Sequence, residues 1–352
     1  MIPPSLPLGI GFHATGAFLA AICYAPQKYI KGWAWEIFWM TQAAWCWLLW
    51  PIIGALLTVP HLIHVLAQSP PDRMLFAFLM GIAYGIGGTA FNISIRYIGF
   101  ALTYSIAVGL SSVIGTLVPP LVRGEVGAIL HRPGAAWVLL GVTAGAAGIA
   151  FCGAAGHLKE RSLEAAAGKR GEFSLSKGLT LSLLAGIFSA VYGLALEVAA
   201  PIADVAEQNG AGIWKGNVSY LFANTGAFVT ALAYSIYLAR RNGTFTQLER
   251  LPKSNGTSRI AYNYLFAMLT GTLWYGQFFF YNLGHVRLGT QYAFSSWAIH
   301  MILLVLLSNL IAVGFQEWKG CNSRTRLIMS MGIVVLCAAV LMLTYGNSLG
   351  EG

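Results

Sequence analysis

Two stretches of the sequence, GIAYGIGGTAFNISIRYIG at residues 81–99 and GTLWYGQFFFYNLGHVRLG at residues 271–289, match each other at a constant offset of 190 positions. Both begin and end with Gly, and both have an aromatic residue at the fourth position. Both also hold an aromatic residue, an asparagine and an aliphatic residue in succession, with Asn92 matching Asn282. The match indicates an internal repeat, and both copies are long and apolar enough to be membrane-spanning helices.

The composition of the chain is that of an integral membrane protein. Only 9% of the 352 residues are charged and 57% are hydrophobic, whereas a soluble domain is about 25% charged. A bilayer core of about 30 Å needs roughly 20 apolar residues per helix. The sequence therefore predicts an all-α protein with ten transmembrane helices, near residues 6–26, 34–58, 74–95, 101–122, 136–156, 178–200, 217–239, 260–281, 290–314 and 327–346.

The repeat divides the ten predicted helices into five plus five. The first repeat is expected at 1–156 and the second at 178–352, joined by a cytoplasmic linker at 157–177. Because five is odd, the second copy crosses the membrane in the opposite sense, and inverted repeats are typical of transporters that work by alternating access. The sequence has no Gly-x-x-x-x-Gly-Lys-Ser/Thr motif, which argues against ATP as the energy source.

The distribution of Lys and Arg predicts the orientation in the membrane. The gaps after the odd-numbered predicted helices hold 16 of the 21 Lys and Arg residues, and the gaps after the even-numbered ones hold 5. Since cytoplasmic loops are enriched in positive charge, the odd gaps should face the cytoplasm, and both termini should lie in the periplasm. This topology explains the net charge of +9 without a nucleic-acid partner.

Amide and aromatic side chains recur within the predicted helices and suggest a sugar as substrate. A sugar needs amides that pair with its hydroxyl groups and aromatic rings that cover its C–H groups, because a buried hydroxyl without a partner costs roughly 1–3 kcal/mol. The alternative interpretation is that the amides join helices and the rings lie at the membrane interface. The predicted substrate-binding residues are Gln42, Trp45, Tyr84, Asn92, Trp274, Gln277, Tyr281, Asn282, Gln291, Tyr292 and Trp297.

Ionisable residues inside predicted spans are the candidates for proton coupling, since such residues are rare and usually functional. Glu197 is the only acid well inside a predicted span, although it lies near a helix end. His13, His285 and His300 lie in or beside spans, and histidine exchanges protons near neutral pH. Glu36, at the start of a predicted helix, is expected at the interface, paired with Lys28 or Lys31.

Six short motifs resemble the L-rhamnose–proton symporter family of the drug/metabolite transporter superfamily. They are CYAPQKYIKGWAWE (23–36), IRYIG (95–99), HLKER (157–161), WYGQFFFYNLGH (274–285), SSWAIHM (295–301) and QEW (316–318). The resemblance implies ten helices in a five-plus-five arrangement, a multi-pass location in the bacterial inner membrane, and uptake of a 6-deoxyhexose with a proton. The chain departs from the family pattern at Ala293, where an acid is usual, and at Glu197, where an amide is usual.

The combined prediction is a secondary transporter that imports L-rhamnose or a related deoxyhexose by proton symport. The alternatives are a metabolite or drug exporter of the same superfamily and a passive sugar facilitator. An enzyme is not expected, because the chain has neither an HExxH nor a GxSxG motif. The expected coupling ion is the proton, with no cofactor and no metal, and the expected partners are a small neutral sugar and the lipid bilayer. The sequence leaves both monomer and homodimer open.

Overall fold

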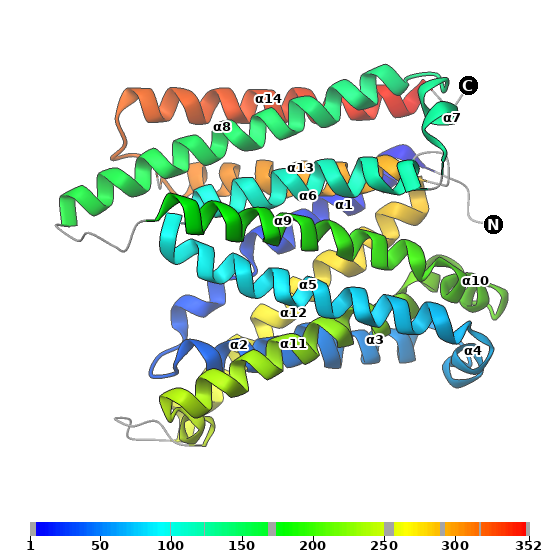
Figure 1. Cartoon of the computed structure of the whole chain (residues 1–352), viewed down its shortest axis with the longest axis horizontal. Coiled ribbons are helices and arrows are strands. Elements are labelled where there is room, and N and C mark those ends of the chain that lie inside the picture. The colour runs from blue at the N-terminus through cyan, green and yellow to red at the C-terminus, as the bar shows by residue number, and fades with distance from the viewer. Residues whose placement is uncertain are drawn as a thin grey trace. The chain divides into compact units, whose positions relative to one another are not determined.

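The computed structural model describes residues 5–98, 100–122, 124–167, 174–249, 257–288, 293–316 and 318–349, and within these ranges every regular element is a helix (Figure 1). The helices up to residue 167 are α1 (Leu6–Ile22), η1 (Ala25–Tyr29), α2 (Trp35–Ala43), η2 (Ala44–Leu49), α3 (Trp50–Thr58), α4 (Leu62–Gln68), α5 (Pro71–Ile98), α6 (Phe100–Val122), α7 (Val126–Leu130) and α8 (Ala135–Ala167). The helices after residue 167 are α9 (Leu175–Val198), α10 (Ala200–Gln208), η3 (Gly212–Val218), α11 (Ser219–Asn242), η4 (Phe245–Leu248), α12 (Thr257–Leu288), α13 (Ala293–Gly314) and α14 (Ser323–Ser348).

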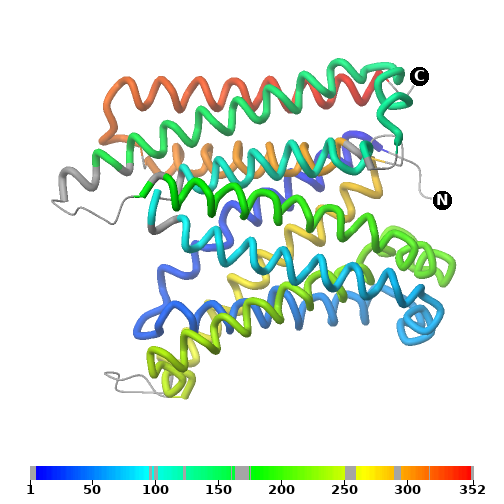
Figure 2. The backbone as a smooth tube through the Cα atoms, viewed as in Figure 1, coloured from blue at the N-terminus to red at the C-terminus, as the bar shows by residue number. Residues whose placement is uncertain are grey.

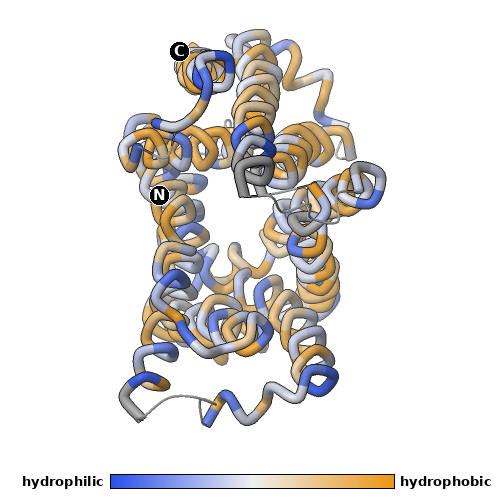
Figure 3. Tube along the Cα trace, turned by 90° about the vertical axis from the view of Figure 1, so that its left-hand side faces the viewer, coloured by the Kyte–Doolittle hydropathy of each residue, from blue (hydrophilic) through white to orange (hydrophobic). Residues whose placement is uncertain are grey.

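Nine helical runs in the described part of the chain are long and apolar enough to cross a membrane. They correspond to nine of the ten predicted spans. In Figure 3, which looks along the helices, most of their residues are coloured as hydrophobic. The tenth prediction, 260–281, falls on α12, which is long enough but is less apolar because it carries Trp, Tyr, Asn and Gln residues. The class of integral membrane protein is therefore supported, and the count of ten stays a prediction.

Several helix boundaries differ from those expected from the sequence. The span predicted to end at residue 156 continues as α8 to Ala167, so residues 157–167 of the predicted linker are helical. Ala and Leu, which favour helix, are frequent in this extension. Short helices α4, α7 and α10 also occupy segments that the sequence left as gaps.

The backbone divides into two compact units. The first unit consists of Ile22–Ile86 and Ala195–Asn282, and the second consists of Ile2–Ala21, Gly87–Leu194 and Leu283–Gly352. Each unit thus takes segments from both halves of the sequence. A unit of packing and a repeat in sequence are different divisions of a chain, so the halves 1–156 and 178–352 stay a prediction.

In the second unit, α8 and α14 lie side by side along most of their length (Figure 1). Small residues at the contact allow this close approach, as is common between membrane helices. A Cβ atom added at Gly141 would lie 2.8 Å from Leu343, and one added at Gly332 would lie 2.6 Å from the Sγ of Cys152. At the other end of α14, the Asn322 side chain caps the helix by accepting a hydrogen bond from the Thr325 N–H at 2.8 Å.

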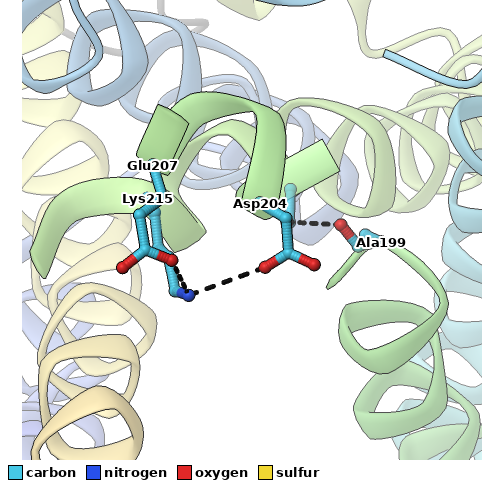
Figure 4. Close-up of polar contacts among 5 residues, drawn as sticks. Ala199, Asp204, Glu207 and Lys215 are labelled. Carbon is cyan, nitrogen blue, oxygen red and sulfur yellow. Dashed lines mark hydrogen bonds and ion pairs between the residues drawn. The ribbon is translucent and has the colours of Figure 1, made fainter. Parts of the chain in front are cut away.

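In the first unit, Lys215 of η3 bridges two acidic side chains of α10. Its Nζ lies 2.5 Å from Glu207 Oε2 and 3.6 Å from Asp204 Oδ1, and Figure 4 shows the ammonium between the two carboxylates. The acidic side chains are about half exposed, with relative areas of 60% for Asp204 and 46% for Glu207. Because exposed ion pairs contribute at most about 1 kcal/mol, we regard this group as a local clamp between α10 and η3.

Candidate substrate and proton sites

Helix α2 passes into α3 through the π-helical segment η2 (Ala44–Leu49), where the Trp50 N–H bonds to the Trp45 carbonyl five residues earlier. Figure 2 shows α2, η2 and α3 as one continuous helical run. A π segment adds a residue to the turn and is frequent at functional sites. It changes which side chains share a face, because residues five apart come closer to alignment than in an α-helix.

Three tryptophans of the first unit contact one another, and we call Trp39, Trp47 and Trp274 the tryptophan triad. Their ring centroids are 5.5 to 5.9 Å apart, and each pair of ring planes meets at 72 to 79°. Trp39 and Trp47 are buried, with 4% and 2% exposure, whereas Trp274 is partly exposed. Two partly exposed tyrosines extend the cluster, with Tyr84 against Trp47 at 6.1 Å and Tyr24 against Trp274 at 5.2 Å.

Gln42 lies on α2 between Trp39 and Trp47 in sequence, and its side chain is fully buried. Neither Oε1 nor Nε2 of its amide has a hydrogen-bond partner within the protein. The helix α12 packs closely here, since a Cβ atom added at Gly271 would lie 2.7 Å from the Gln42 carbonyl oxygen. An unsatisfied buried amide costs roughly 1–3 kcal/mol, which makes Gln42 a strong candidate for binding a polar ligand.

The other predicted sugar-binding residues of the first unit have different surroundings. The Trp45 ring lies 6.2 Å from Trp50 and forms no described ring contact with the triad. Gln277 and Tyr281 are buried on α12, one and two turns after Trp274. Asn282 donates a long hydrogen bond of 3.5 Å to the Ile213 carbonyl and packs against the backbone of η3, which favours a role in holding that segment.

Glu36 belongs to a group of hydrogen bonds that joins the start of α2 to the end of α11 and the residues after it. It is 5% exposed, and its Oε1 accepts hydrogen bonds from Asn242 Nδ2 at 3.0 Å and Thr244 Oγ1 at 2.8 Å. Beside it, the Ala34 N–H donates to Gln247 Oε1 at 2.6 Å. Glu36 was expected at the interface and paired with Lys28 or Lys31. It is instead buried, and the two partners described above are neutral side chains.

We expect Glu36→Ala to destabilise the protein by about 3 kcal/mol or more, because hydrogen bonds to a charged group contribute about 1.5–3 kcal/mol each and two donors lose their acceptor. Glu36→Gln should cost less, since its amide oxygen can still accept. Thermal unfolding in detergent measures both changes. The exposed Glu249→Ala variant is the control, and equal melting of Glu36→Ala and Glu249→Ala would contradict this role.

In the second unit, His13 of α1 and His300 of α13 come together. Their exposures are 0% and 2%, and their rings meet edge to face with centroids 5.7 Å apart. The His13 Nε2 is hydrogen bonded to Ser296 Oγ at 3.0 Å. The end of α12 covers the same imidazole, because a Cβ atom added at Gly284 would lie 2.8 Å from His13 Nε2. Two imidazoles that are buried this close together cannot both carry a charge at low cost.

The remaining predicted site residues have different surroundings, and their roles in binding or proton coupling stay predictions. In the second unit, the Trp297 indole donates to the Ser111 carbonyl at 3.1 Å, and Asn92 Nδ2 donates to Gly88 O at 2.9 Å, so both have partners within the protein. His285 lies half-buried near the end of α12, and Glu197 of the first unit lies half-buried one residue before α9 ends. Gln291 and Tyr292 lie outside the described residues.

Sequence reasoning missed Trp39 and Trp47. The i, i+3 rule places Trp45 above Gln42 in a regular α-helix, and the π segment shifts this register. The signal that was present is the density of Trp in 33–50, which alone does not reveal which rings face inwards. Among the described residues, no group of His, Cys, Asp and Glu side chains could hold a metal ion.

Comparison with known proteins identifies the family. Residues 3–348 match the family model described as L-rhamnose-proton symport protein. Curated proteins named L-rhamnose-proton symporter from Salmonella paratyphi B, Salmonella newport and Salmonella agona are each 33% identical over 337 residues, covering 95% of this chain and 96% of the relative. This agrees with the expectation of a transporter and not an enzyme. The chain belongs to the L-rhamnose–proton symport protein family.

Proposed function

We propose that this chain imports L-rhamnose together with protons across the bacterial inner membrane, by alternating access. The observation that supports this most strongly is the family match over residues 3–348. Nine apolar helices in the described part support a multi-pass membrane location. The proton supplies the energy by moving down its gradient with the sugar.

Our proposal for the sugar site is the region of the first unit around Trp47, with Tyr84, Trp274 and the amide of Gln42 as its residues. All three were expected from the sequence to bind the substrate, and the rings of Tyr84 and Trp274 both contact Trp47. The buried Gln42 amide has no partner within the protein and can both donate to and accept from sugar hydroxyls. Gln277 and Tyr281, on the same helix as Trp274, complete the proposed set.

Our proposal for the proton site is the pair His13 and His300 in the second unit. It is supported by burial of both rings, their edge contact, and the hydrogen bond between His13 Nε2 and Ser296 Oγ. Only one charge is tolerated in such a pair, so the pair binds and releases one proton as a unit. Glu197 and His285 are the other candidates, and Glu197 is more accessible than either imidazole of the pair.

For the architecture, we propose that α12 is the tenth membrane-spanning helix and that the ten helices form an inverted repeat. The spacing of the matching stretches in α5 and α12 supports the repeat, and the length of α12 is sufficient to span a bilayer. The 16 to 5 division of Lys and Arg supports termini on the periplasmic side.

The function is tested by uptake of labelled L-rhamnose into proteoliposomes. We expect accumulation above the external concentration when an inward proton gradient is imposed, and collapse of that accumulation when an uncoupler is added. Equilibration that ignores the gradient would indicate a passive facilitator. Absence of L-rhamnose uptake in a correctly folded preparation would favour an exporter of another metabolite.

A further inference from the structure

The tryptophan triad has the geometry of a corner. Each of its three ring planes makes an angle of 72 to 79° with the other two, and all centroids lie within 5.9 Å of one another. A flat sugar face stacks best on one ring or between parallel rings. Three nearly perpendicular rings instead surround a compact apolar group, such as a methyl group.

Besides the Nε1 of Trp274, two groups on the α2–η2 run carry buried polar atoms without a hydrogen-bond partner. The Gln42 amide contributes a buried oxygen and a buried nitrogen, and the Trp47 indole contributes a buried Nε1, all without a partner within the protein. Gln42 and Trp47 are five residues apart across the π segment, which brings them closer to one face of the helix than an α-helix would. Polar groups and aromatic rings therefore occur together on one short segment.

We propose that this corner is the specificity subsite for the methyl group of the 6-deoxyhexose, and that Gln42 binds hydroxyl groups of the sugar ring. The proposal rests on the proposed function and deepens it. L-Rhamnose carries a methyl group where L-mannose carries a hydroxymethyl group, and the two sugars are otherwise identical. An indole N–H donates in the plane of its ring, so over the three ring faces the additional hydroxyl loses its hydrogen bonds to water without finding a new partner, while the methyl group loses none.

The partial exposure of Trp274 and Tyr84 fits this assignment. Trp39 and Trp47 form the buried side of the corner, with exposures of 4% and 2%, whereas Trp274 and Tyr84 keep part of their surface accessible. A ligand therefore reaches the corner past Trp274 and Tyr84. Both residues belong to the set that the sequence itself predicted for sugar binding.

The experiment is competition against labelled L-rhamnose uptake in proteoliposomes, with unlabelled L-rhamnose and unlabelled L-mannose as competitors. The ratio of their half-inhibiting concentrations measures the discrimination. We expect the wild-type protein to prefer L-rhamnose by about 10- to 100-fold, the range in which an apolar site rejects an added hydroxyl group. A wild-type ratio near one would overturn the proposal.

Two variants separate the roles of ring and amide. Trp47→Phe should lower the ratio several-fold, because the smaller ring leaves room for the hydroxymethyl group. Gln42→Leu should weaken the binding of both sugars by at least about 10-fold and leave the ratio of their half-inhibiting concentrations unchanged. The reason is that the amide is assigned to hydroxyl groups that both sugars share. A lowered ratio in Gln42→Leu, or an unchanged ratio in Trp47→Phe, would overturn the assignment.

The same series of variants includes controls for correct folding. Replacing an unsatisfied buried amide by an apolar side chain of similar size removes the penalty of its lost hydration, so Gln42→Leu should melt at or above the wild-type temperature. Wild-type transport by this variant would show that the amide is not part of the site. Trp50→Phe is the matched control for Trp47→Phe, since Trp50 lies on the same helical run and its indole donates to Thr272 Oγ1 at 2.8 Å. The competition ratio of the Trp50→Phe variant should equal that of the wild type.

The failure of this proposal is distinguishable from failure of the proposed function. If wild-type proteoliposomes accumulate L-rhamnose in a proton gradient but the Trp47→Phe ratio does not change, only the subsite is wrong. If the wild-type protein does not transport L-rhamnose at all, the function fails first.

Discussion

Replacing His300 by Phe is expected to abolish concentrative L-rhamnose uptake while leaving the exchange of L-rhamnose between the two sides of the membrane. Phe keeps an aromatic ring of similar shape against His13, whose ring lies 5.7 Å away, but it cannot bind a proton. Accumulation requires the proton, whereas exchange requires only that the sugar-loaded protein changes its orientation. The ratio of internal to external L-rhamnose at steady state should therefore fall to one.

Two comparison variants make this result specific. His64→Phe removes an exposed histidine of α4 and should accumulate L-rhamnose normally. Glu197→Gln should also accumulate it, if the imidazole pair carries the proton. Loss of accumulation in Glu197→Gln together with normal accumulation in His300→Phe would transfer the proton-coupling role to Glu197 and refute our assignment.

Gly81→Ala is expected to have the largest effect on stability in the first unit. A Cβ atom at position 81 would lie 2.0 Å from the carbonyl oxygen of Ala223 on α11, and one at Gly226 would lie 2.1 Å from the Phe78 carbonyl. Backbone atoms cannot rotate away as side chains do, so α5 and α11 must separate. The cost should reach or exceed the upper end of the about 1–3 kcal/mol typical of overpacking, which outweighs the gain of up to about 1 kcal/mol from replacing Gly by Ala in a helix.

The measurement for this variant is the yield of monodisperse protein in detergent and its thermal unfolding temperature. Gly88→Ala is the matched control on the same helix, since a Cβ atom there meets no atom within 4 Å, and it should be as stable as wild type or more so. Equal yield and stability of the Gly81 and Gly88 variants would contradict the close approach of α5 and α11.

The type and order of the long helices in the described part of the chain could be predicted from the sequence, because nine of them are long apolar runs. Local chemistry also explains where this prediction was inexact. The Ala-rich end of α8 extends to Ala167 beyond the apolar run, since a helix can continue into water where its residues favour it. The helix α12 is not among the nine apolar runs because it carries the polar and aromatic residues that suggested a binding site.

The candidate site was only partly predictable. Gln42, Tyr84 and Trp274 were identified because an amide or aromatic residue within an apolar run is visible in the sequence. Trp47 was missed because the π segment at Ala44–Leu49 changes the register of the helix. Trp39 lies before that segment and could not be told apart from the other Trp residues between 33 and 50. Contacts between distant segments cannot be read from periodicity either. For this reason the hydrogen bonds that Asn242 and Thr244 donate to Glu36 were not foreseen.

The central claim, that sugar and proton move together, is tested most directly by following external pH. L-Rhamnose is added to a lightly buffered suspension of de-energised cells that express the protein, and L-mannose is added to a parallel sample. The account predicts that L-rhamnose causes a rise in external pH, which an uncoupler removes, because protons enter with the sugar. Entry of labelled L-rhamnose without any change in external pH would contradict it.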